Sequence, residues 1–183
     1  GFSVADTLAE LGAKQLVIAQ KAQADLVDIL EVLEVPYLLG EAAEGVPQQL
    51  IDLDPQLIVT SPGIRPDSPI IEWATAAGIP VWVDIDLAWR LRDKTERIAK
   101  WICITGTNGK TTTTQLTEAM LVAGGLRAVS CGNIGTPILD AIRDPQGFDA
   151  IVVELSSFQL HYLGQISPYS SAVLNLADDH LDW

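Results

Sequence analysis

Short apolar runs alternate with amphipathic stretches along the first half of the chain. Apolar runs that predict strands lie at residues 15–19, 37–39, 57–60 and 80–85. Between residues 22 and 35, leucine and isoleucine recur every three to four positions, which predicts a helix with one buried face. Strands that alternate with helices indicate a parallel sheet with helices on both faces. We therefore expect an α/β fold.

Other helices in this half are predicted from capping signals. Ser3, with an acidic residue three positions later, predicts the start of a first helix that Gly12 ends. Ser68 predicts a helix cap, with Pro69 in the first turn and Gly78 after the helix end. A short helix is expected over residues 86–92. These helices connect the predicted strands.

A charged segment, residues 92–97, interrupts this alternation and precedes a second series. The second series predicts strands at 98–105, 127–131, 150–154 and 172–176, and helices at 111–123 and 137–143. We place a domain boundary near Thr95, which divides the chain into domains 1–94 and 95–183. The alternative is a solvated turn inside one larger sheet.

Both ends of the chain interrupt the α/β pattern. The first predicted helix has no strand before it, and the chain stops at Trp183, shortly after a polar cluster. A doubly wound domain begins with a strand whose carboxyl end meets the first helix. We therefore interpret the sequence as a fragment of a longer protein.

Composition narrows the class of protein. The 183 residues carry 24 acidic and 11 basic side chains, a net charge of −13, and phosphate neutralisation by a nucleic-acid-binding protein needs clustered Lys and Arg. Hydrophobic residues make up 48%, which excludes intrinsic disorder. Cys103 and Cys131 sit in apolar runs, as reduced core cysteines do. We expect a cytoplasmic protein with no nucleic-acid partner and no membrane insertion.

A glycine-rich loop between a predicted strand and a predicted helix has the features of a phosphate site. Gly106 and Gly109 allow a tight turn whose amides point at a polyphosphate, and the helix adds the positive end of its dipole. Lys110 would reach the β- and γ-phosphates, and the Thr111 hydroxyl would ligate Mg²⁺. The loop departs from the GxxxxGK[ST] pattern because Ile104 replaces the first glycine. The alternative is a glycine-rich turn with a surface lysine.

Two other strand ends carry candidate metal ligands. Glu154 ends the apolar run at 150–154, and the carboxyl ends of parallel strands meet at one edge of a sheet. A carboxylate there suits Mg²⁺, which prefers oxygen ligands. His180, beside Asp179, follows the last predicted strand and is a candidate ligand through its neutral imidazole. The alternatives are a solvated carboxylate and a surface histidine.

Two tight loops also follow predicted strands. One spans residues 132–135 and contains Asn133, and the other spans residues 61–64 and contains Gly63. Each is suited to presenting amides to a ligand, and each is equally an ordinary turn between a strand and a helix. The spacing leaves both interpretations open.

Together, these segments resemble the Mur ligase family. The resemblance rests on TGTNGKTT at 105–112, GNIG at 132–135, VVELSSFQL at 152–160 and NLADDHLDW at 175–183. The ELSSFQL stretch is typical of the branch of that family that adds D-glutamate. In the first half, TSPGI at 60–64 and DIDL at 84–87 resemble the family more loosely.

The resemblance implies a three-domain enzyme of which this chain holds two parts. The first is a Rossmann-like parallel-sheet domain for a uridine nucleotide, without its first strand. The second is the front part of a P-loop ATPase-type α/β central domain, with ATP and Mg²⁺ as cofactors. The implied cofactor-binding residues are Gly106, Thr107, Asn108, Gly109, Lys110, Thr111 and Thr112.

The resemblance also implies roles for individual side chains. The implied metal ligands are Thr111, Glu154 and His180. Lys110, Glu154 and His180 are the implied catalytic residues, and Gly63 and Asn133 are implied to lie near the muramoyl substrate. The family's acidic contact to uracil is replaced here by the sequence AQK at 19–21, and its carbamylated lysine lies beyond Trp183.

The implied reaction is ATP-dependent peptide-bond formation in peptidoglycan precursor synthesis. D-Glutamate would be added to UDP-N-acetylmuramoyl-L-alanine through an acyl phosphate, by a monomeric enzyme. The fragment alone is expected to be inactive, because the domain that brings the amino acid is absent. The alternatives are a sister Mur ligase, a folylpolyglutamate-type ligase, and a P-loop nucleotide-binding module without ligase activity.

Overall fold

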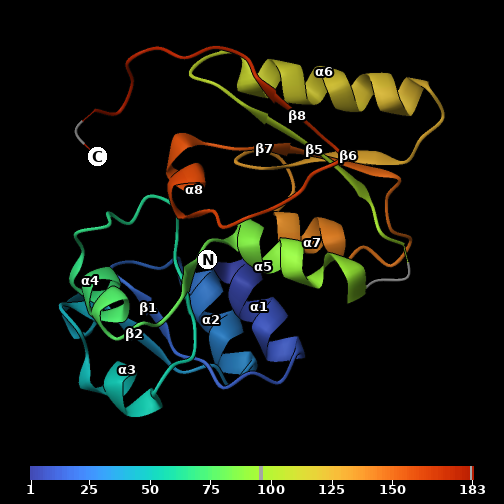
Figure 1. Cartoon of the computed structure of the whole chain (residues 1–183). Helices are drawn as coiled ribbons and strands as arrows, with labels where there is room; N and C mark the ends of the chain where they lie inside the picture. Colours follow the sequence, from blue (N-terminus) through green and yellow to red (C-terminus); the bar gives the residue numbers. More distant parts are fainter. Residues whose placement is uncertain (95–96, 182) are drawn as a thin grey trace. The chain divides into compact units, whose positions relative to one another are not determined.

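The computed structural model describes residues 1–94, 97–181 and 183. The chain divides into two compact units, Gly1–Val81 and Trp82–Trp183 (Figure 1). The boundary expected near Thr95 falls outside the described residues. Contacts assign the helix α5 (Asp84–Leu91) to the second unit, where it packs against α7 (Ile138–Ile142). The domain limits at residues 94 and 95 stay a prediction.

The first unit has an α/β arrangement built on two short strand pairs. Its strands are β1 (Val17–Ala19), β2 (Tyr37–Leu39), β3 (Ile58–Val59) and, at the unit's border, β4 (Val81–Trp82). β1 pairs with β2 in parallel, and β3 pairs with β4. Its helices are α1 (Phe2–Glu10), α2 (Ala24–Val32), α3 (Gln48–Leu53) and α4 (Pro69–Ala76), with a 3₁₀ turn at Gly40–Ala43. Ala5, Leu30 and Val35 form a buried cluster that joins α1 and α2 to the β1–β2 pair. Neither α3 nor the 3₁₀ turn was predicted from the sequence pattern.

Two predicted helix starts differ in the structure. α1 begins at Phe2 with Gly1 at its cap, so Ser3 lies inside the helix and its capping role was wrong. α5 begins at Asp84, although residues 84 and 85 were predicted to end a strand. The reason is that Asp86 accepts a hydrogen bond from the Val83 backbone N–H, which satisfies an amide at the helix start. The Ser68 and Pro69 start of α4 is confirmed.

The second unit is built on a parallel sheet with the strand order β6-β7-β5-β8. Its strands are β5 (Lys100–Thr105), β6 (Ala128–Gly132), β7 (Ala150–Glu154) and β8 (Ser170–Val173). Its remaining helices are α6 (Lys110–Ala123) and α8 (Ser157–Tyr162), with a 3₁₀ turn at Arg92–Lys94. Figure 1 shows α6 on one face of the sheet and α5 with α7 on the other. The second unit thus has the parallel sheet with helices on both faces that the alternating pattern predicts. The first half of the chain, where the same kind of sheet was expected, has described strands in two separate pairs instead.

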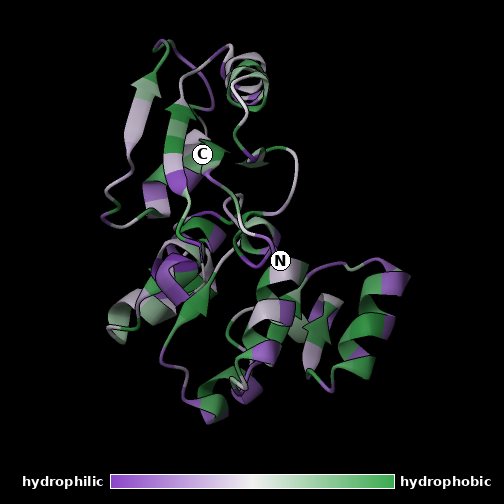
Figure 2. Cartoon of the chain, turned by 90° about the vertical axis from the view of Figure 1, so that its right-hand side faces the viewer, coloured by the Kyte–Doolittle hydropathy of each residue, from purple (hydrophilic) through white to green (hydrophobic). Residues whose placement is uncertain are grey.

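The core of the second unit lies around β7. Each of the five residues of β7 is buried, as expected for an inner strand of a parallel sheet covered on both faces. The inner strands are coloured as apolar in Figure 2. Glu154 differs from the other residues of β7, because its side chain is a carboxylate and only 1% of its surface is exposed. A charged group is therefore placed at the end of the most apolar strand.

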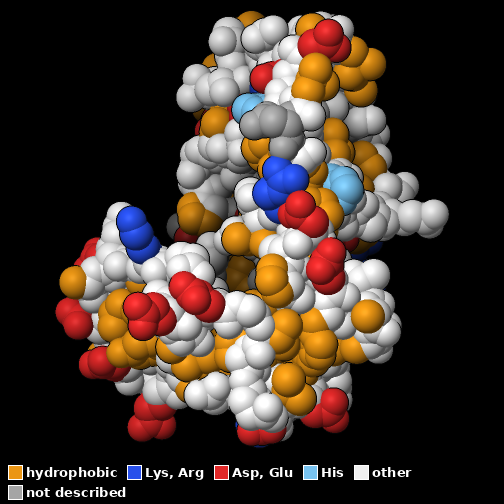
Figure 3. Space-filling model, turned by 90° about the vertical axis from the view of Figure 1, so that its left-hand side faces the viewer, with side chains coloured by type: hydrophobic (Ala, Val, Ile, Leu, Met, Phe, Trp, Pro, Cys, Tyr) orange, Lys and Arg blue, Asp and Glu red, His pale blue; other side chains and the backbone are white. Residues whose placement is uncertain are grey.

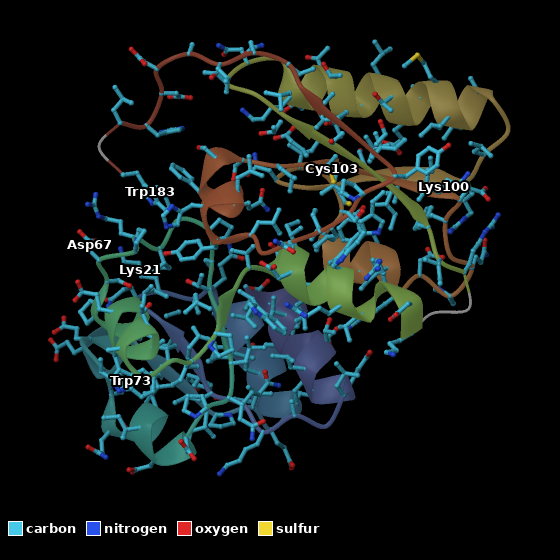
Figure 4. All side chains as sticks on the ribbon, in the orientation of Figure 1. Lys21, Asp67, Trp73, Lys100, Cys103 and Trp183 are labelled. Carbon is cyan, nitrogen blue, oxygen red and sulfur yellow. The ribbon has the colours of Figure 1, made fainter. Side chains whose placement is uncertain are left out.

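Both cysteines lie in this core, as predicted. Cys103 on β5, labelled in Figure 4, and Cys131 on β6 are free and buried. Burial raises the pKa of the Cys103 thiol to about 12 and raises the pKa of Cys131 as well. Both side chains therefore behave as small apolar groups at neutral pH.

The surface carries the excess of acidic residues. Figure 3 shows Asp and Glu side chains spread over the face that it draws, with few Lys and Arg side chains among them. Among the helices of the described residues, none is both long enough and apolar enough to span a bilayer.

Candidate active site

The four strands of the second unit bring most of the predicted site residues to one edge of the sheet. Because all four strands are parallel, their carboxyl ends lie together, with Ile104 in register with Glu154 and Gly132 also in register with Glu154. Thr105 is in register with Val173 of β8. The phosphate loop, the Asn133 loop and the segment that leads to His180 all follow these strand ends. This placement is the one expected for a ligand site in an open α/β sheet.

The glycine-rich loop connects β5 to the start of α6, as predicted. Gly109 precedes the helix with φ +82°, in the left-handed region that favours glycine. The first backbone bond into the helix runs from the Thr113 N–H to the Gly109 carbonyl. The amides of Lys110, Thr111 and Thr112 therefore have no acceptor within the helix, which leaves them suited to an anion.

Lys110 is folded back over its own loop. Its Nζ donates to the carbonyl oxygens of Gly106 at 2.8 Å and Thr107 at 3.0 Å. The ammonium group therefore lies over the loop's own carbonyls, within reach of the space in front of the helix start. Thr111 is exposed in the first turn of α6.

Glu154 is held from one side only. The side-chain amide of Asn133 donates to its Oε1 at 2.8 Å, and the Asn133 backbone N–H donates to its carbonyl oxygen at 2.9 Å. Its Oε2 is buried without a hydrogen-bond partner among the described residues. A buried carboxylate oxygen without a donor is costly unless a cation or a water completes it. This orphaned oxygen fits the predicted Mg²⁺ ligand.

The close approach of β6 to β7 explains the glycine at position 132. A Cβ on Gly132 would lie 2.4 Å from the Glu154 carbonyl oxygen, and the residue has φ +95°. Only a glycine fits this position, and its absence of a side chain lets the Asn133 loop reach the carboxylate. The GNIG loop therefore has a structural role in placing Asn133 on Glu154.

His180 lies in the segment after β8 and packs against α8. Its ring packs on Phe158 of α8, with ring centroids 4.8 Å apart, and its Nε2 lies 3.7 Å from Asp179. The side chain is 54% exposed. Within the described residues, no group of three or more His, Cys, Asp and Glu side chains gathers as a metal site. The predicted set of Thr111, Glu154 and His180 contains only two side chains of these types, and the metal role of His180 stays a prediction.

Trp183, labelled in Figure 4, extends this aromatic packing. Its ring centroid lies 4.7 Å from that of Phe158 and 5.0 Å from that of His161. The segment after β8 is therefore anchored on α8. His161, which the sequence did not assign to a site, takes part in this packing.

Gly63 lies in the first unit, in the turn after β3. The turn is closed by a hydrogen bond from the Ile64 N–H to the Ser61 carbonyl, and Gly63 is exposed with open space where a Cβ would stand. The geometry is that of an ordinary turn with an accessible backbone. Its predicted contact with a muramoyl substrate stays a prediction.

Two features of the site were missed at the level of sequence. Ser156 and Gln159 form a capping box that starts α8, and the S-x-x-Q spacing is a signal from which that helix was predictable. Asn175 pairs with Asn108 of the phosphate loop, 67 positions away, through two hydrogen bonds of 2.9 Å. No local pattern indicates such a long-range pairing.

Comparison with known proteins identifies the relatives of this chain. Residues 104–183 match the family described as the Mur ligase middle domain. The chain is 57% identical over 194 aligned positions to a UDP-N-acetylmuramoylalanine–D-glutamate ligase of Leifsonia xyli and 47% identical over 188 positions to one of Tropheryma whipplei. Both alignments include all of this chain, which spans 38% of the length of each relative.

Solved structures support the fold. The UDP-N-acetylmuramate:L-alanyl-gamma-D-glutamyl-meso-diaminopimelate ligase of Neisseria meningitides aligns with 99% of this chain and 58% of its own, at TM-score 0.54 and 20% identity. A UDP-N-acetylmuramate–alanine ligase of Thermotoga maritima aligns with 100% of this chain and 41% of its own, at TM-score 0.50 and 21% identity. These structures show that the α/β fold is that of Mur ligases. The chain is thus a homologue of the UDP-N-acetylmuramoylalanine–D-glutamate ligases, and from residue 104 onward it belongs to the Mur ligase middle-domain family.

Proposed function

We propose that the protein containing this chain is a cytoplasmic, ATP-dependent ligase that joins D-glutamate to UDP-N-acetylmuramoyl-L-alanine. The observation that carries the proposal is the orphaned, buried Oε2 of Glu154 at the same sheet edge as the phosphate loop. The 57% identity to the Leifsonia xyli enzyme supports the choice of substrates. In this proposal the first unit has the Rossmann-like role of binding the uridine nucleotide.

The chemical task is to bring two anions together. The carboxylate of the alanyl substrate attacks the γ-phosphorus of ATP, and ADP leaves to give an acyl phosphate. The amine of D-glutamate then attacks the acyl carbon, and phosphate leaves as the peptide bond forms. Two unit charges 4 Å apart repel by about 4 kcal/mol at an effective dielectric constant of 20. The site must offset that repulsion.

The residues of the phosphate loop and its neighbours supply this offset. Lys110 turns from the loop carbonyls to the β- and γ-phosphates, and the free amides of the first helical turn bind phosphate oxygens. Thr111, Glu154 and His180 are the residues that would hold Mg²⁺, which supplies positive charge to the triphosphate. Asn133 orients Glu154, and with Gly63 it is proposed to lie near the muramoyl substrate.

The test is an assay of the full-length protein for amino-acid-dependent ADP release. With UDP-N-acetylmuramoyl-L-alanine, D-glutamate is expected to support ADP release and formation of the extended nucleotide, whereas L-glutamate and L-lysine are not. A parallel reaction without the UDP substrate serves as the control. Turnover with a different amino acid would instead support a sister ligase. ATP binding without turnover on any amino acid would support a nucleotide-binding module.

A further inference from the structure

The first half of the phosphate loop is held by the segment after β8. The side chain of Asn175 accepts from the Asn108 N–H and donates to the Asn108 carbonyl, both at 2.9 Å. The Thr107 hydroxyl accepts from the Ala177 N–H at 2.9 Å and donates to the Ala177 carbonyl at 3.2 Å. The loop and this segment are thus joined by two reciprocal pairs, which we call the loop clamp.

The clamp continues the β5–β8 ladder beyond the strands. The last ladder-like bonds run from the Leu174 N–H to the Thr105 carbonyl and from the Thr107 N–H to the Asn175 carbonyl. The Asn175 side chain then acts as one more peptide group, since it offers a donor and an acceptor to the same residue. Asn175 and Asn108 are exposed, so water could satisfy their polar groups if they were not paired.

Backbone packing at the clamp is close. A Cβ on Gly106 would lie 3.1 Å from both the N and the O of Asn175. The glycine therefore allows the segment after β8 to approach the loop closely enough for the Asn175 side chain to reach Asn108. The first glycine of the loop is thus needed for the close packing at the clamp.

The clamp divides the loop amides into two sets. The N–H groups of Thr107 and Asn108 are committed to Asn175. The amides of Lys110, Thr111 and Thr112 remain without an acceptor in the helix. An anion can therefore bind the amides of the second half of the loop. The hydrogen bonds of the first half fix the orientation of those amides.

On the basis of the proposed function, we infer that Asn175 and Thr107 are positioning residues for ATP. They hold the loop in the shape that presents the amides of the first helical turn, and they tie that loop to residues 178–180, which include His180. ATP affinity therefore depends on Asn175, whose side-chain amide is bonded to the backbone of the loop. The clamp also connects the phosphate loop to the segment that carries His180, the predicted metal ligand.

The experiment measures ATP binding and steady-state kinetics in the full-length protein. Asn175→Ala removes both amide bonds, and Asn175→Asp keeps the acceptor but loses the donor. Thr107→Val removes the hydroxyl, whereas Thr107→Ser keeps it. Gln146→Ala is the matched control, because it removes an exposed amide side chain in a turn before β7. Binding is followed with a fluorescent ATP analogue, with UDP-N-acetylmuramoyl-L-alanine binding and thermal melting measured in parallel.

Asn175→Ala is expected to raise the Kd and the KM for ATP about tenfold, with kcat changed less and the Kd of the UDP substrate unchanged. Asn175→Asp is expected to lose at least as much ATP affinity as Asn175→Ala, because the carboxylate repels the Asn108 carbonyl and the phosphates. Thr107→Ser is expected to retain more affinity than Thr107→Val. Gln146→Ala is expected to match the parent.

Parental ATP affinity in both Asn175→Ala and Thr107→Val would overturn the inference. So would an equal loss of affinity for ATP and for the UDP substrate, because that pattern indicates partial unfolding. ATP binding can be measured without turnover. A parent protein that binds ATP but joins no amino acid would refute the ligase proposal, and the effect of the clamp variants on ATP affinity could still be measured.

Discussion

The side-chain amide of Asn133 donates to Oε1 of Glu154 at 2.8 Å and leaves Oε2 without a partner among the described residues. One oxygen of the carboxylate is thus used to orient the group, and the other is available to a ligand. The carboxylate is buried at the end of the most apolar strand, where the desolvation of a charge is costly. Burial of this carboxylate therefore lowers the stability of the fold, while its free oxygen remains available to a ligand.

Replacing Glu154 is therefore expected to separate activity from stability. Glu154→Gln removes the charge, so ligase turnover is expected to fall by about 10²-fold or more. The free energy of unfolding is expected to stay equal or to rise, since a buried charge is lost. Turnover is measured over a series of Mg²⁺ concentrations, and stability by urea unfolding. Glu118→Gln on α6 serves as the control, and parental turnover in Glu154→Gln at every Mg²⁺ concentration would contradict the assignment.

In the full-length protein, Lys110→Ala is expected to abolish ATP hydrolysis and leave the fold intact. The two hydrogen bonds of its Nζ go to carbonyls of its own loop, so no contact to the core is lost. Phosphate release measures the activity, and circular dichroism measures the fold. Lys100→Ala is the matched control, because Lys100 lies at the opposite end of β5, over the ring of Tyr169 (Figure 4). Unchanged hydrolysis by Lys110→Ala would remove this lysine from the site.

Gly132→Ala is expected to destabilise the second unit by about 3 kcal/mol or more, because a backbone clash adds to a strained φ. The matched variant is Gly125→Ala, which has φ +84° and open space at the Cβ position. That variant isolates the conformational strain, at about 1–2 kcal/mol. Urea unfolding measures both. Equal losses in the two variants would show that contact with Glu154 has no effect at position 132.

The buried thiols predict a loss of stability at high pH. The pKa of Cys103 is about 12 in the folded chain, and that of Cys131 is also raised by burial. An unfolded thiol ionises at about pH 8.5, so above that pH the unfolded state has fewer bound protons than the folded state. Stability is constant below that pH and falls above it, by up to about 1.4 kcal/mol per pH unit for each thiol.

This slope is measured by urea unfolding between about pH 7.5 and pH 10, a range that spans the unfolded thiol pKa. The double variant Cys103→Ala, Cys131→Ala is expected to lose stability at all pH values and to show a shallower slope. The same slope in the parent and the double variant would refute the assignment of this pH dependence to the thiols.

Strands that are buried in the core were predictable from the sequence. β7 was placed to the residue, because an inner parallel strand requires an uninterrupted apolar run and position 154 ends it with a carboxylate. β8 was placed two to three residues too late, since its residues are exposed and carry no burial pattern. The predictable strands are those that the core constrains.

The parts of the site that lie at strand ends and in the glycine-rich loop were predictable from the sequence. The phosphate loop and Glu154 follow from strand ends and glycine spacing, and the structure brings them to one edge. The Asn175–Asn108 pairing and the packing of His180 on Phe158 depend on contacts between distant segments. Such contacts are set by the folded sheet, so the local sequence contains no signal for them.

The last strand of the sheet order has an unpaired edge among the described residues. β8 pairs with β5 on one side only among the described residues, and each of its four residues is exposed. Val173 is 64% exposed and Leu176, just beyond the strand, is 87% exposed. An uncovered strand edge presents unpaired backbone N–H and C=O groups to which a further strand can add by hydrogen bonds. The edge beside the loop clamp is thus the place where a further strand would extend this sheet.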